Sequence, residues 1–353
     1  MSLNIWKMFC GGKCEINKLP KEYQFAHDLS FFLHDILVQI IKSGEEAEIF
    51  ASRFKIDSPK DLETFSVLSG DELWVWLEEN NYQYVLDDLV LRQATVALLS
   101  DFCHFIYEAL KCSKKMKLTV AFALLRKPLK DNLFYLEWLL VNKPDFLKTF
   151  KDGLSEPTTD VRRDVIKLAV DSIATPGLYG SDLIYDFRYK KSANFGFEGN
   201  WNKANHLITT FRDFKTEAQN FNFVFSGEEE RETQLRFLYT RLPYLLNYVV
   251  EVMESLLENI EKTDPVYIES MRLRRLAGLT IWAQSLDPIH CGWDIEKFSE
   301  KLKEYLKIEC PKCSQVYSPD LKFMGILYEG GKMRCPLCGS VSRLPLKSVR
   351  LTP

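Results

Sequence analysis

The chain has 353 residues, of which 46% are hydrophobic, 13% aromatic and 27% charged, and its formal net charge is −3. This composition excludes a generally disordered chain, because it supplies enough apolar side chains for a large core. So small a net charge also excludes a protein that coats nucleic acid over its whole surface. The longest run without a charged residue is 276–286, which is too short to cross a bilayer. We therefore expect no membrane contact.

The cysteines and the N-terminal residues indicate a cytoplasmic protein. Two pairs of cysteines have the spacing of metal ligands, and isolated cysteines such as Cys103 lie in apolar helical patterns, which is typical of a reducing compartment. The first residues lack the apolar core of a signal peptide. Residues 1–20 have little periodicity and are predicted to be a mobile leader. Cys10 and Cys14 in this leader have no second cysteine pair beside them, so their role stays open.

Residues 21–300 carry apolar side chains at spacings of three and four, which predicts a body of antiparallel helices. A sub-boundary is expected near residue 80. The predicted helical segments are about 22–40, 71–77, 84–114, 117–141, 160–173, 206 onward, 228–260, 266–286 and 294–307. The fold class is therefore mainly α, a multi-helix antiparallel bundle followed by a small β module at residues 301–353.

A polar stretch interrupts the predicted helix at 117–141. Residues 126–132 are largely polar and lie between two strongly apolar flanks, and Pro128 should kink or restart the helix because it lacks an N–H group. Two interpretations remain open. The stretch is either a solvated helix face or a polar pocket at a kink that contains Arg126 and Asp131.

Residues 175–205 are predicted to be the least regular part of the body. They combine seven aromatic side chains with Arg188, Lys190 and Lys191. Aromatic and basic side chains together suit base stacking and phosphate contact, but they suit a loop packed onto the helices equally well.

The helix pattern of residues 80–265, with Arg188 followed after five residues by Asn194, resembles the HEPN superfamily. These helical proteins belong to prokaryotic toxin and antiviral systems, and members that cleave RNA carry Arg, four to six residues and His near a helix start. The resemblance therefore implies a metal-independent ribonuclease. Asparagine, which stands here where histidine is expected, cannot serve as a general acid or base near neutral pH. His206 could replace it only if the loop folds back. The catalytic candidates are thus Arg188, Asn194, His206, Arg126 and Asp131.

Other catalytic motifs are missing from the sequence. It contains no G-x-x-x-x-G-K-[ST], no H-E-x-x-H and no G-x-S-x-G. The sequence therefore favours a non-catalytic body, and ribonuclease is the expected class if the body is an enzyme.

The strongest motif is a pair of C-x2-C turns near the C-terminal end. Each two-residue gap lets one tight turn direct two thiolates at one point, and two such turns supply the tetrahedral sulfur ligands that Zn²⁺ prefers. The CPxC and CPxCG knuckles resemble the zinc-ribbon family over about the last fifty residues. One structural Zn²⁺ is expected, with a rubredoxin-type iron site as the alternative. The predicted ligands are Cys310, Cys313, Cys335 and Cys338.

The ribbon is predicted to be a β module with a basic surface. Residues 315–317 and 323–328 are β-prone, residues 329–332 form a turn, and a third strand follows from Val341. Residues 301–353 have a formal charge of +6, and residues 1–300 have −9. Phosphate contact and docking of the basic tail on the acidic body both remain open. The candidates for nucleic-acid contact are Lys312, Lys322, Lys332, Arg334, Arg343, Lys347 and Arg350.

Three functions follow from these features. The first is a helical scaffold whose zinc ribbon contacts RNA, DNA or a protein, in keeping with a prokaryotic defence or toxin system. The second is a HEPN-like ribonuclease or toxin, and the third is a purely protein-binding sensor, with a homodimer as one form of partner.

Overall fold

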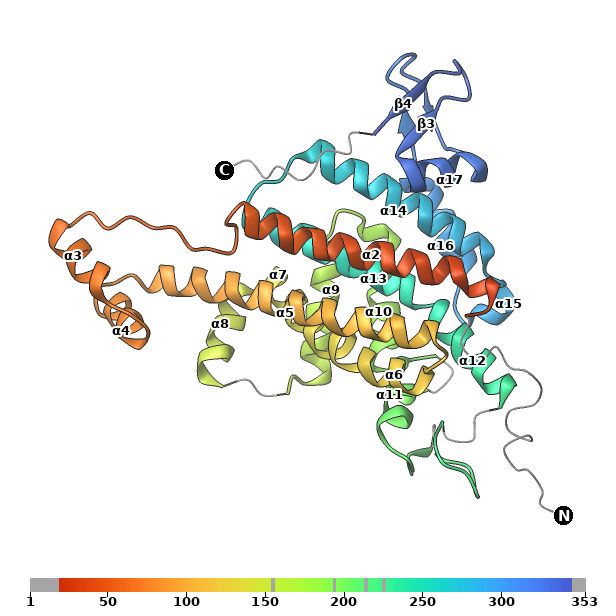
Figure 1. The fold of residues 1–353 in the computed structure, drawn as a ribbon, viewed down its shortest axis with the longest axis horizontal. Helices are drawn as coiled ribbons and strands as arrows, with labels where there is room; N and C mark the ends of the chain where they lie inside the picture. Colours follow the sequence, from red (N-terminus) through yellow and green to blue (C-terminus); the bar gives the residue numbers. More distant parts are fainter. Residues whose placement is uncertain (1–18, 154–155, 193–194, 213–214, 224–226, 345–353) are drawn as a thin grey trace.

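A computed structural model describes residues 19–153, 156–192, 195–212, 215–223 and 227–344. These residues are mainly α-helical, with two short antiparallel strand pairs near the C-terminal end (Figure 1). The predicted fold class is therefore confirmed. Cys10 and Cys14 lie outside the described residues.

The helical body contains the following elements in chain order: α2 (Lys21–Glu46), α3 (Pro59–Val67), α4 (Asp71–Glu79), α5 (Gln83–Lys114), α6 (Leu118–Lys127), a π-helical turn (Pro128–Asn132), α7 (Leu133–Val141), α8 (Lys143–Asp152), α9 (Thr159–Ser172), a 3₁₀ turn (Pro176–Leu178), α10 (Ser181–Tyr189), α11 (Phe197–Asn205), α12 (Glu228–Tyr239), α13 (Leu242–Glu258), α14 (Pro265–Ser285), α15 (Pro288–Cys291) and α16 (Ile295–Tyr305). The ribbon contains β1 (Ile308–Glu309), β2 (Val316–Tyr317), α17 (Leu321–Gly330), β3 (Lys332–Arg334) and β4 (Val341–Arg343).

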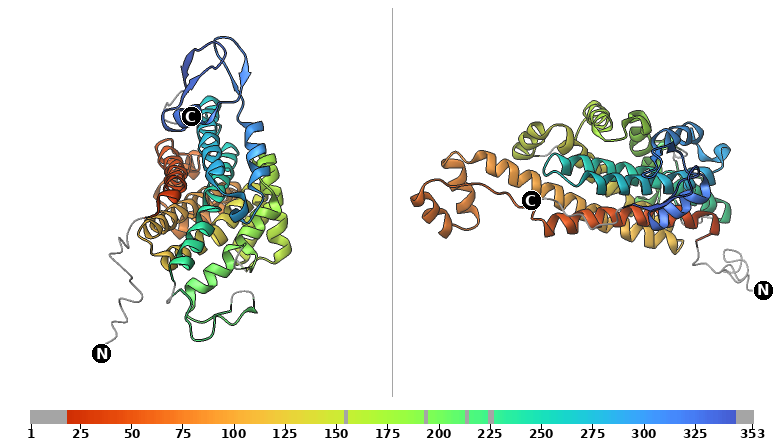
Figure 2. Two further views of the ribbon diagram at one scale, coloured as in Figure 1. Left: turned by 90° about the vertical axis from the view of Figure 1, so that its right-hand side faces the viewer. Right: turned by 90° about the horizontal axis from the view of Figure 1, so that it is seen from above.

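Helix α13 lies at the centre of the body and is buried on nearly every side from Leu242 to Leu257. It packs against α2 and α7, while α5 packs against α2 and α6. Figure 2 shows these long helices running in roughly similar directions. A helix that is apolar all round must be covered all round, which explains why α13 occupies the centre.

The predicted interruption at Pro128 is a single π-helical turn between α6 and α7. The N–H of Leu133 donates to the carbonyl of Pro128, five residues earlier. Proline supplies no N–H to the α-helical hydrogen-bond ladder, and a wider turn accommodates this loss without ending the helix. The turn brings Leu129, Lys130 and Asn132 into buried positions.

Helices α3 and α4 form an arm that projects beyond the body, at the left of Figure 1. Leu77 of the arm packs with Val85 and Leu86 at the start of α5 in a small hydrophobic cluster that is separate from the main core. Several apolar side chains of the arm are exposed, including Val67 at 78% and Val75 at 51%.

The body differs from the prediction in three places. Residues 175–205 contain α10 and α11, because aromatic residues at helical spacing anchor both helices in the core. The described residues after His206 have no regular helix until α12, since their polar side chains bond one another around Asn222. The predicted helix at 228–260 is two helices that meet at Thr240 and Arg241, just before Pro243.

The ribbon differs at residues 323–328, where the predicted strand is helix α17. Asp320 caps this helix by accepting a hydrogen bond from the N–H of Phe323, and Met324 and Leu327 are buried on one face. The apolar run fits both β and helical spacing, and packing against α14 selects the helix. Strand β1 was not predicted, because it is only two residues long.

Helix α5 is the one described helix long and apolar enough to span a membrane by length and composition. Core helices of soluble proteins can have the same length and apolar composition. Helix α5 lies within the bundle, where it contacts α2, α6 and α7.

The contact between α14 and the ribbon depends on Gly278. A Cβ atom at this position would lie 2.9 Å from Leu29 Cδ1 and 2.9 Å from the Tyr328 ring. We therefore expect Gly278→Val to lower the free energy of unfolding by about 1–3 kcal/mol, because it overpacks the junction of α2, α14 and α17. Chemical denaturation followed by circular dichroism measures this change.

The matched control is Gly325→Val, because a Cβ at Gly325 of α17 would meet nothing within 4 Å. We expect this control to be neutral or slightly stabilising, since valine has a higher helix propensity than glycine. Equal destabilisation by both substitutions would contradict a close contact at Gly278.

Candidate metal centre and buried polar networks

The two cysteine pairs lie in two turns with the same backbone geometry. In the first turn the N–H of Ser314 donates to the carbonyl of Cys310, and in the second the N–H of Gly339 donates to that of Cys335. Ser314 and Gly339 both have a left-handed backbone, with φ of 53° and 69°. Glycine adopts this conformation freely, whereas serine does so at a cost that the surrounding turn must offset.

The four sulfur atoms form a compact cluster at the end of the ribbon. All four Sγ atoms lie within 4.8 Å of one another. Cys310 and Cys338 are 3.7 Å apart, as are Cys313 and Cys335. Corners of a tetrahedron with metal–sulfur distances of about 2.3 Å are about 3.8 Å apart, whereas a disulfide needs about 2.05 Å. The predicted cysteine ligands are therefore brought together in an arrangement that can hold a metal ion.

The outer face of the ribbon hairpin is basic. Strands β3 and β4 pair with Lys332 opposite Arg343 and Arg334 opposite Val341. All four of these side chains are exposed. Side chains directly opposite each other in an antiparallel pair lie about 4.5–5.5 Å apart at Cβ. The register therefore places three cations close together on one surface.

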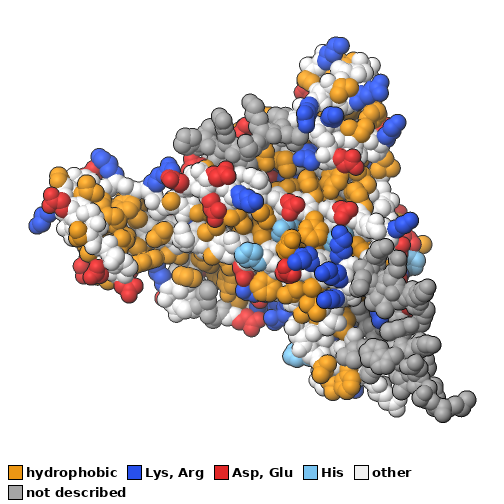
Figure 3. Space-filling view, viewed as in Figure 1, with side chains coloured by type: hydrophobic (Ala, Val, Ile, Leu, Met, Phe, Trp, Pro, Cys, Tyr) orange, Lys and Arg blue, Asp and Glu red, His pale blue; other side chains and the backbone are white. Residues whose placement is uncertain are grey.

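The predicted contact residues Lys312 and Lys322 are also exposed, on the first turn and on α17. Lys and Arg side chains are plentiful over the ribbon at the top of Figure 3. None of the five described candidates has an ion-pair partner among the described carboxylates. Lys347 and Arg350 lie outside the described residues.

The catalytic candidate Arg188 lies at the centre of a buried polar network. Its side chain is 0% exposed, and its Nη1 lies 2.7 Å from both carboxylate oxygens of Glu137. Its Nε donates to the carbonyl of Leu129, and Tyr248 donates its hydroxyl to Glu137. Burial alone would lower the pKa of Arg188, but the adjacent Glu137 raises it above its ordinary value. Arg188 therefore stays charged inside the protein and joins α7, α10 and the π-helical turn.

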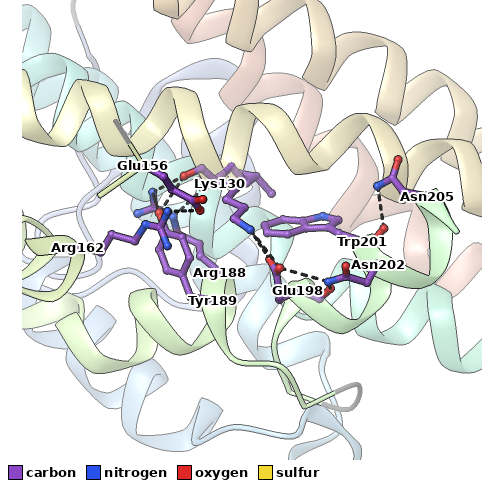
Figure 4. Close-up of polar contacts among 10 residues, drawn as sticks. Lys130, Glu156, Arg162, Arg188, Tyr189, Glu198, Trp201, Asn202 and Asn205 are labelled. Carbon is purple, nitrogen blue, oxygen red and sulfur yellow. Dashed lines mark hydrogen bonds and ion pairs between the residues drawn. The ribbon is translucent and has the colours of Figure 1, made fainter. Parts of the chain in front are cut away.

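A second buried pair extends this network toward α11. Lys130 Nζ lies 3.1 and 3.0 Å from the two carboxylate oxygens of Glu198, and Asn202 donates to the same carboxylate (Figure 4). Tyr189 donates its hydroxyl to the Lys130 carbonyl of the π-helical turn. Burial raises the pKa of Tyr189 above its ordinary range, so the hydroxyl keeps its proton. The polar residues at the kink are thus partly structural anchors.

The remaining candidates occupy different surroundings. Asp131 is half-buried. Burial raises the pKa of its carboxyl above the ordinary value, although the nearby positive charges of Arg126, Lys130 and Arg188 lower it. Arg126 is exposed beside it, so the kink holds both predicted pocket residues. His206 is exposed at the end of α11. Asn194 lies outside the described residues.

The sequence analysis missed a second buried network. Arg275 donates to Asn247, Glu251 and Glu254, and its side chain is 0% exposed. Burial raises the pKa of Glu254 although Arg275 lowers it. Two glutamates three residues apart inside the apolar α13 were the available signal, because buried acids require a partner.

No protein-family model, no curated protein and no solved structure matches this chain. The HEPN resemblance consequently has no support from a family match. The fold and the four-cysteine cluster define the class: a mainly α-helical protein with a C-terminal candidate metal centre.

Proposed function

We propose that this chain is a helical scaffold whose C-terminal zinc ribbon binds the phosphate backbone of nucleic acid. The proposal rests on one observation above the others. Three exposed cations, Lys332, Arg334 and Arg343, share one face of the hairpin whose turn carries Cys335 and Cys338. A phosphate backbone attracts such a cluster and releases bound counterions when it binds.

Zinc is the metal that best suits the cysteine cluster. Four thiolates form a soft ligand set, and zinc accepts them in the tetrahedral arrangement that the Sγ distances fit. Four protein ligands fill the coordination shell, so the metal would hold the two turns together and have no position for substrate. Its role is therefore structural, and the surface around it carries the binding function.

The charge distribution favours the ribbon over the body as the binding surface. Residues 301–353 have a formal charge of +6, which four thiolates and one Zn²⁺ together would reduce to about +4. Residues 1–300 have −9, so most of the body repels phosphate. We assign the body a scaffold role because Arg188 is held by Glu137 in the interior, while His206 lies exposed at the end of α11.

We expect Arg334→Ala/Arg343→Ala to weaken binding to a labelled RNA or duplex DNA, measured by fluorescence anisotropy at several salt concentrations. Each lost phosphate contact should reduce the slope of log affinity against log salt by about 0.7 for a single strand and about 0.9 for a duplex. The double substitution should therefore reduce the slope by about 1.4–1.8.

Lys167→Ala/Lys262→Ala is the matched control, because it removes two exposed lysines from the helical body. This control should leave affinity and salt slope close to those of the unmodified protein. The proposal is wrong if the zinc-loaded protein binds neither nucleic acid at low salt, or if the two double variants behave alike.

A further inference from the structure

A cavity of about 400 Å³ lies between α11, residues 215–223, α12 and α15. Its volume falls within the roughly 300–1,000 Å³ of pockets that bind small ligands. The labels of α11, α12 and α15 mark its place in the right-hand half of Figure 1. The described residues that line it include neither a cysteine of the metal centre nor a member of the Arg188 network, so the cavity is a separate site.

The cavity wall next to α11 is fixed by hydrogen bonds within the chain segment that follows this helix. The N–H of Thr216 donates to the carbonyl of Thr209. The buried side chain of Asn222 donates to the carbonyl of His206 and accepts a hydrogen bond from the hydroxyl of Thr216. The cavity is therefore formed before any ligand enters, which lowers the free-energy cost of binding.

The deepest part of the cavity combines an aromatic ring with a buried cation. Arg241 is 2% exposed, and its guanidinium carbon lies 4.2 Å from the centre of the Phe237 ring. Its Nε donates to the carbonyl of Phe195, and its Nη1 donates to the hydroxyl of Thr240. Burial lowers the pKa of Arg241 to about 10, so the side chain still carries its charge at neutral pH. This charge attracts an anion toward the cavity.

The rim of the cavity carries side chains that a ligand can reach. Lys203 and Lys215 have no ion-pair partner among the described carboxylates, and Gln234 has no hydrogen-bond partner among the described side chains. Phe221 is 43% exposed and supplies a second aromatic ring. Glu229, from the first turn of α12, is exposed as well. The rim thus offers donors for an anion, an aromatic surface and a carboxylate.

This lining favours one class of ligand over others. Lysine side chains bind phosphate oxygens, aromatic rings stack on planar bases, and an amide can pair with the polar edge of a base. Carboxylates such as that of Glu229 accept hydrogen bonds from sugar hydroxyls and repel acidic peptides. A purely apolar ligand would strip water from the lysines without replacing its hydrogen bonds.

We propose that the cavity binds a nucleoside phosphate, with its base against Phe221 and its phosphate beside Lys203 and Lys215. The charge of Arg241 adds to the attraction for the phosphate. The ligand is either a free nucleotide or one nucleotide of an RNA strand, since both carry the same base, sugar and phosphate. The site does not depend on the ribbon, so it can be tested apart from the function proposed above.

Isothermal titration calorimetry on the full zinc-loaded chain tests the class of ligand. The probes are the four ribonucleoside 5′-monophosphates and the four corresponding nucleosides. We expect at least one monophosphate to bind, and its nucleoside to bind at least about tenfold more weakly, because charge-assisted hydrogen bonds to the phosphate are lost.

Two substitutions separate the phosphate contact from the base contact. Lys203→Ala/Lys215→Ala should weaken binding of the monophosphate at least about tenfold and leave that of the nucleoside unchanged. Phe221→Ala should weaken both ligands by about 5- to 150-fold, because it removes base stacking. Lys167→Ala/Lys262→Ala removes two exposed lysines outside the cavity, so this control should bind both ligands as the unmodified protein does.

Competition distinguishes the two sources of the ligand. The variant Arg334→Ala/Arg343→Ala, which is altered only in the ribbon, should keep its affinity for the monophosphate. Displacement of the monophosphate from this variant by a short single-stranded RNA would assign the cavity to one nucleotide of a strand. A lack of displacement would assign it to a free nucleotide.

Absence of binding by all four monophosphates at millimolar concentration would overturn the proposal, as would equal binding of a monophosphate and its nucleoside. Equal affinity of Lys203→Ala/Lys215→Ala and the lysine control for the monophosphate would also overturn it. Loss of RNA binding by the ribbon variant alone, with monophosphate binding intact, would bear on the ribbon and leave the cavity assigned.

Discussion

Arg188→Ala should cause a large loss of stability in the helical body. It would leave the Glu137 carboxylate buried without its cation and remove the donor to the Leu129 carbonyl. Breaking a buried ion pair from one side typically costs about 3–5 kcal/mol. We therefore expect a decrease of this size in the free energy of unfolding, measured by urea denaturation.

Two controls separate the buried pair from a general effect of losing arginine. Arg163→Ala removes a half-exposed arginine that pairs with Asp182 on the surface, and it should cost no more than about 1 kcal/mol. Glu137→Leu/Arg188→Met replaces both charges by apolar groups and should recover part of the lost stability. If Arg188→Ala were as mild as Arg163→Ala, the buried pair would not contribute as its geometry implies.

The same reasoning affects any test of RNA cleavage. A variant of Arg188 that loses activity could do so because its body unfolds. Arg126→Ala and His206→Ala alter exposed side chains and are better probes of a ribonuclease function.

Cys335→Ser should remove the bound metal and unfold the ribbon while most of the helical body remains folded. Structural zinc sites contribute about 10–16 kcal/mol of apparent binding free energy, which becomes folding free energy when the site forms only with the ribbon. We expect metal analysis to fall from about one equivalent of zinc to none, and nucleic-acid binding to disappear with it. Excess chelator should act on the unmodified protein in the same way.

Cys112→Ser is the control for this experiment, because Cys112 is a partly buried cysteine of α5 outside the cluster. It should retain the metal and its affinity for nucleic acid. Retention of one metal equivalent by Cys335→Ser would argue against a four-cysteine centre. Loss of zinc with unchanged nucleic-acid binding would argue against the ribbon as the binding surface.

The cysteine cluster was predictable from sequence because its geometry is local. A two-residue gap fixes the separation of two thiolates in one turn, so only the meeting of the two turns depended on the fold. The interruption at Pro128 was predictable for the same reason, since the missing N–H is a property of the residue itself. Long apolar stripes likewise predicted α5 nearly to its ends and the start of α2, which continues six residues beyond the predicted end at residue 40.

The role of Arg188 was not predictable in this way. Its partner Glu137 lies 51 residues earlier, in an apolar stretch whose single acid is 0% exposed. Only the packing of α10 against the π-helical turn brings the two together. The predicted strand at residues 323–328 was wrong for a related reason. Packing against α14 decides between strand and helix there, and α14 is distant in the sequence.

The π-helical turn has a consequence for insertions and deletions in this chain. One such turn contains about one residue more than an α-helical turn, so it rotates everything after it by about 100° around the helix axis. Deleting one residue between Pro128 and Asn132 would convert this turn to an ordinary α-helical turn and leave Glu137 facing Arg188, whereas a regular α-helix of unchanged length would turn Glu137 away by about 100°. The wide geometry of this turn therefore sets which face of α7 meets the core, and the chain should tolerate loss of one residue here better than gain of one.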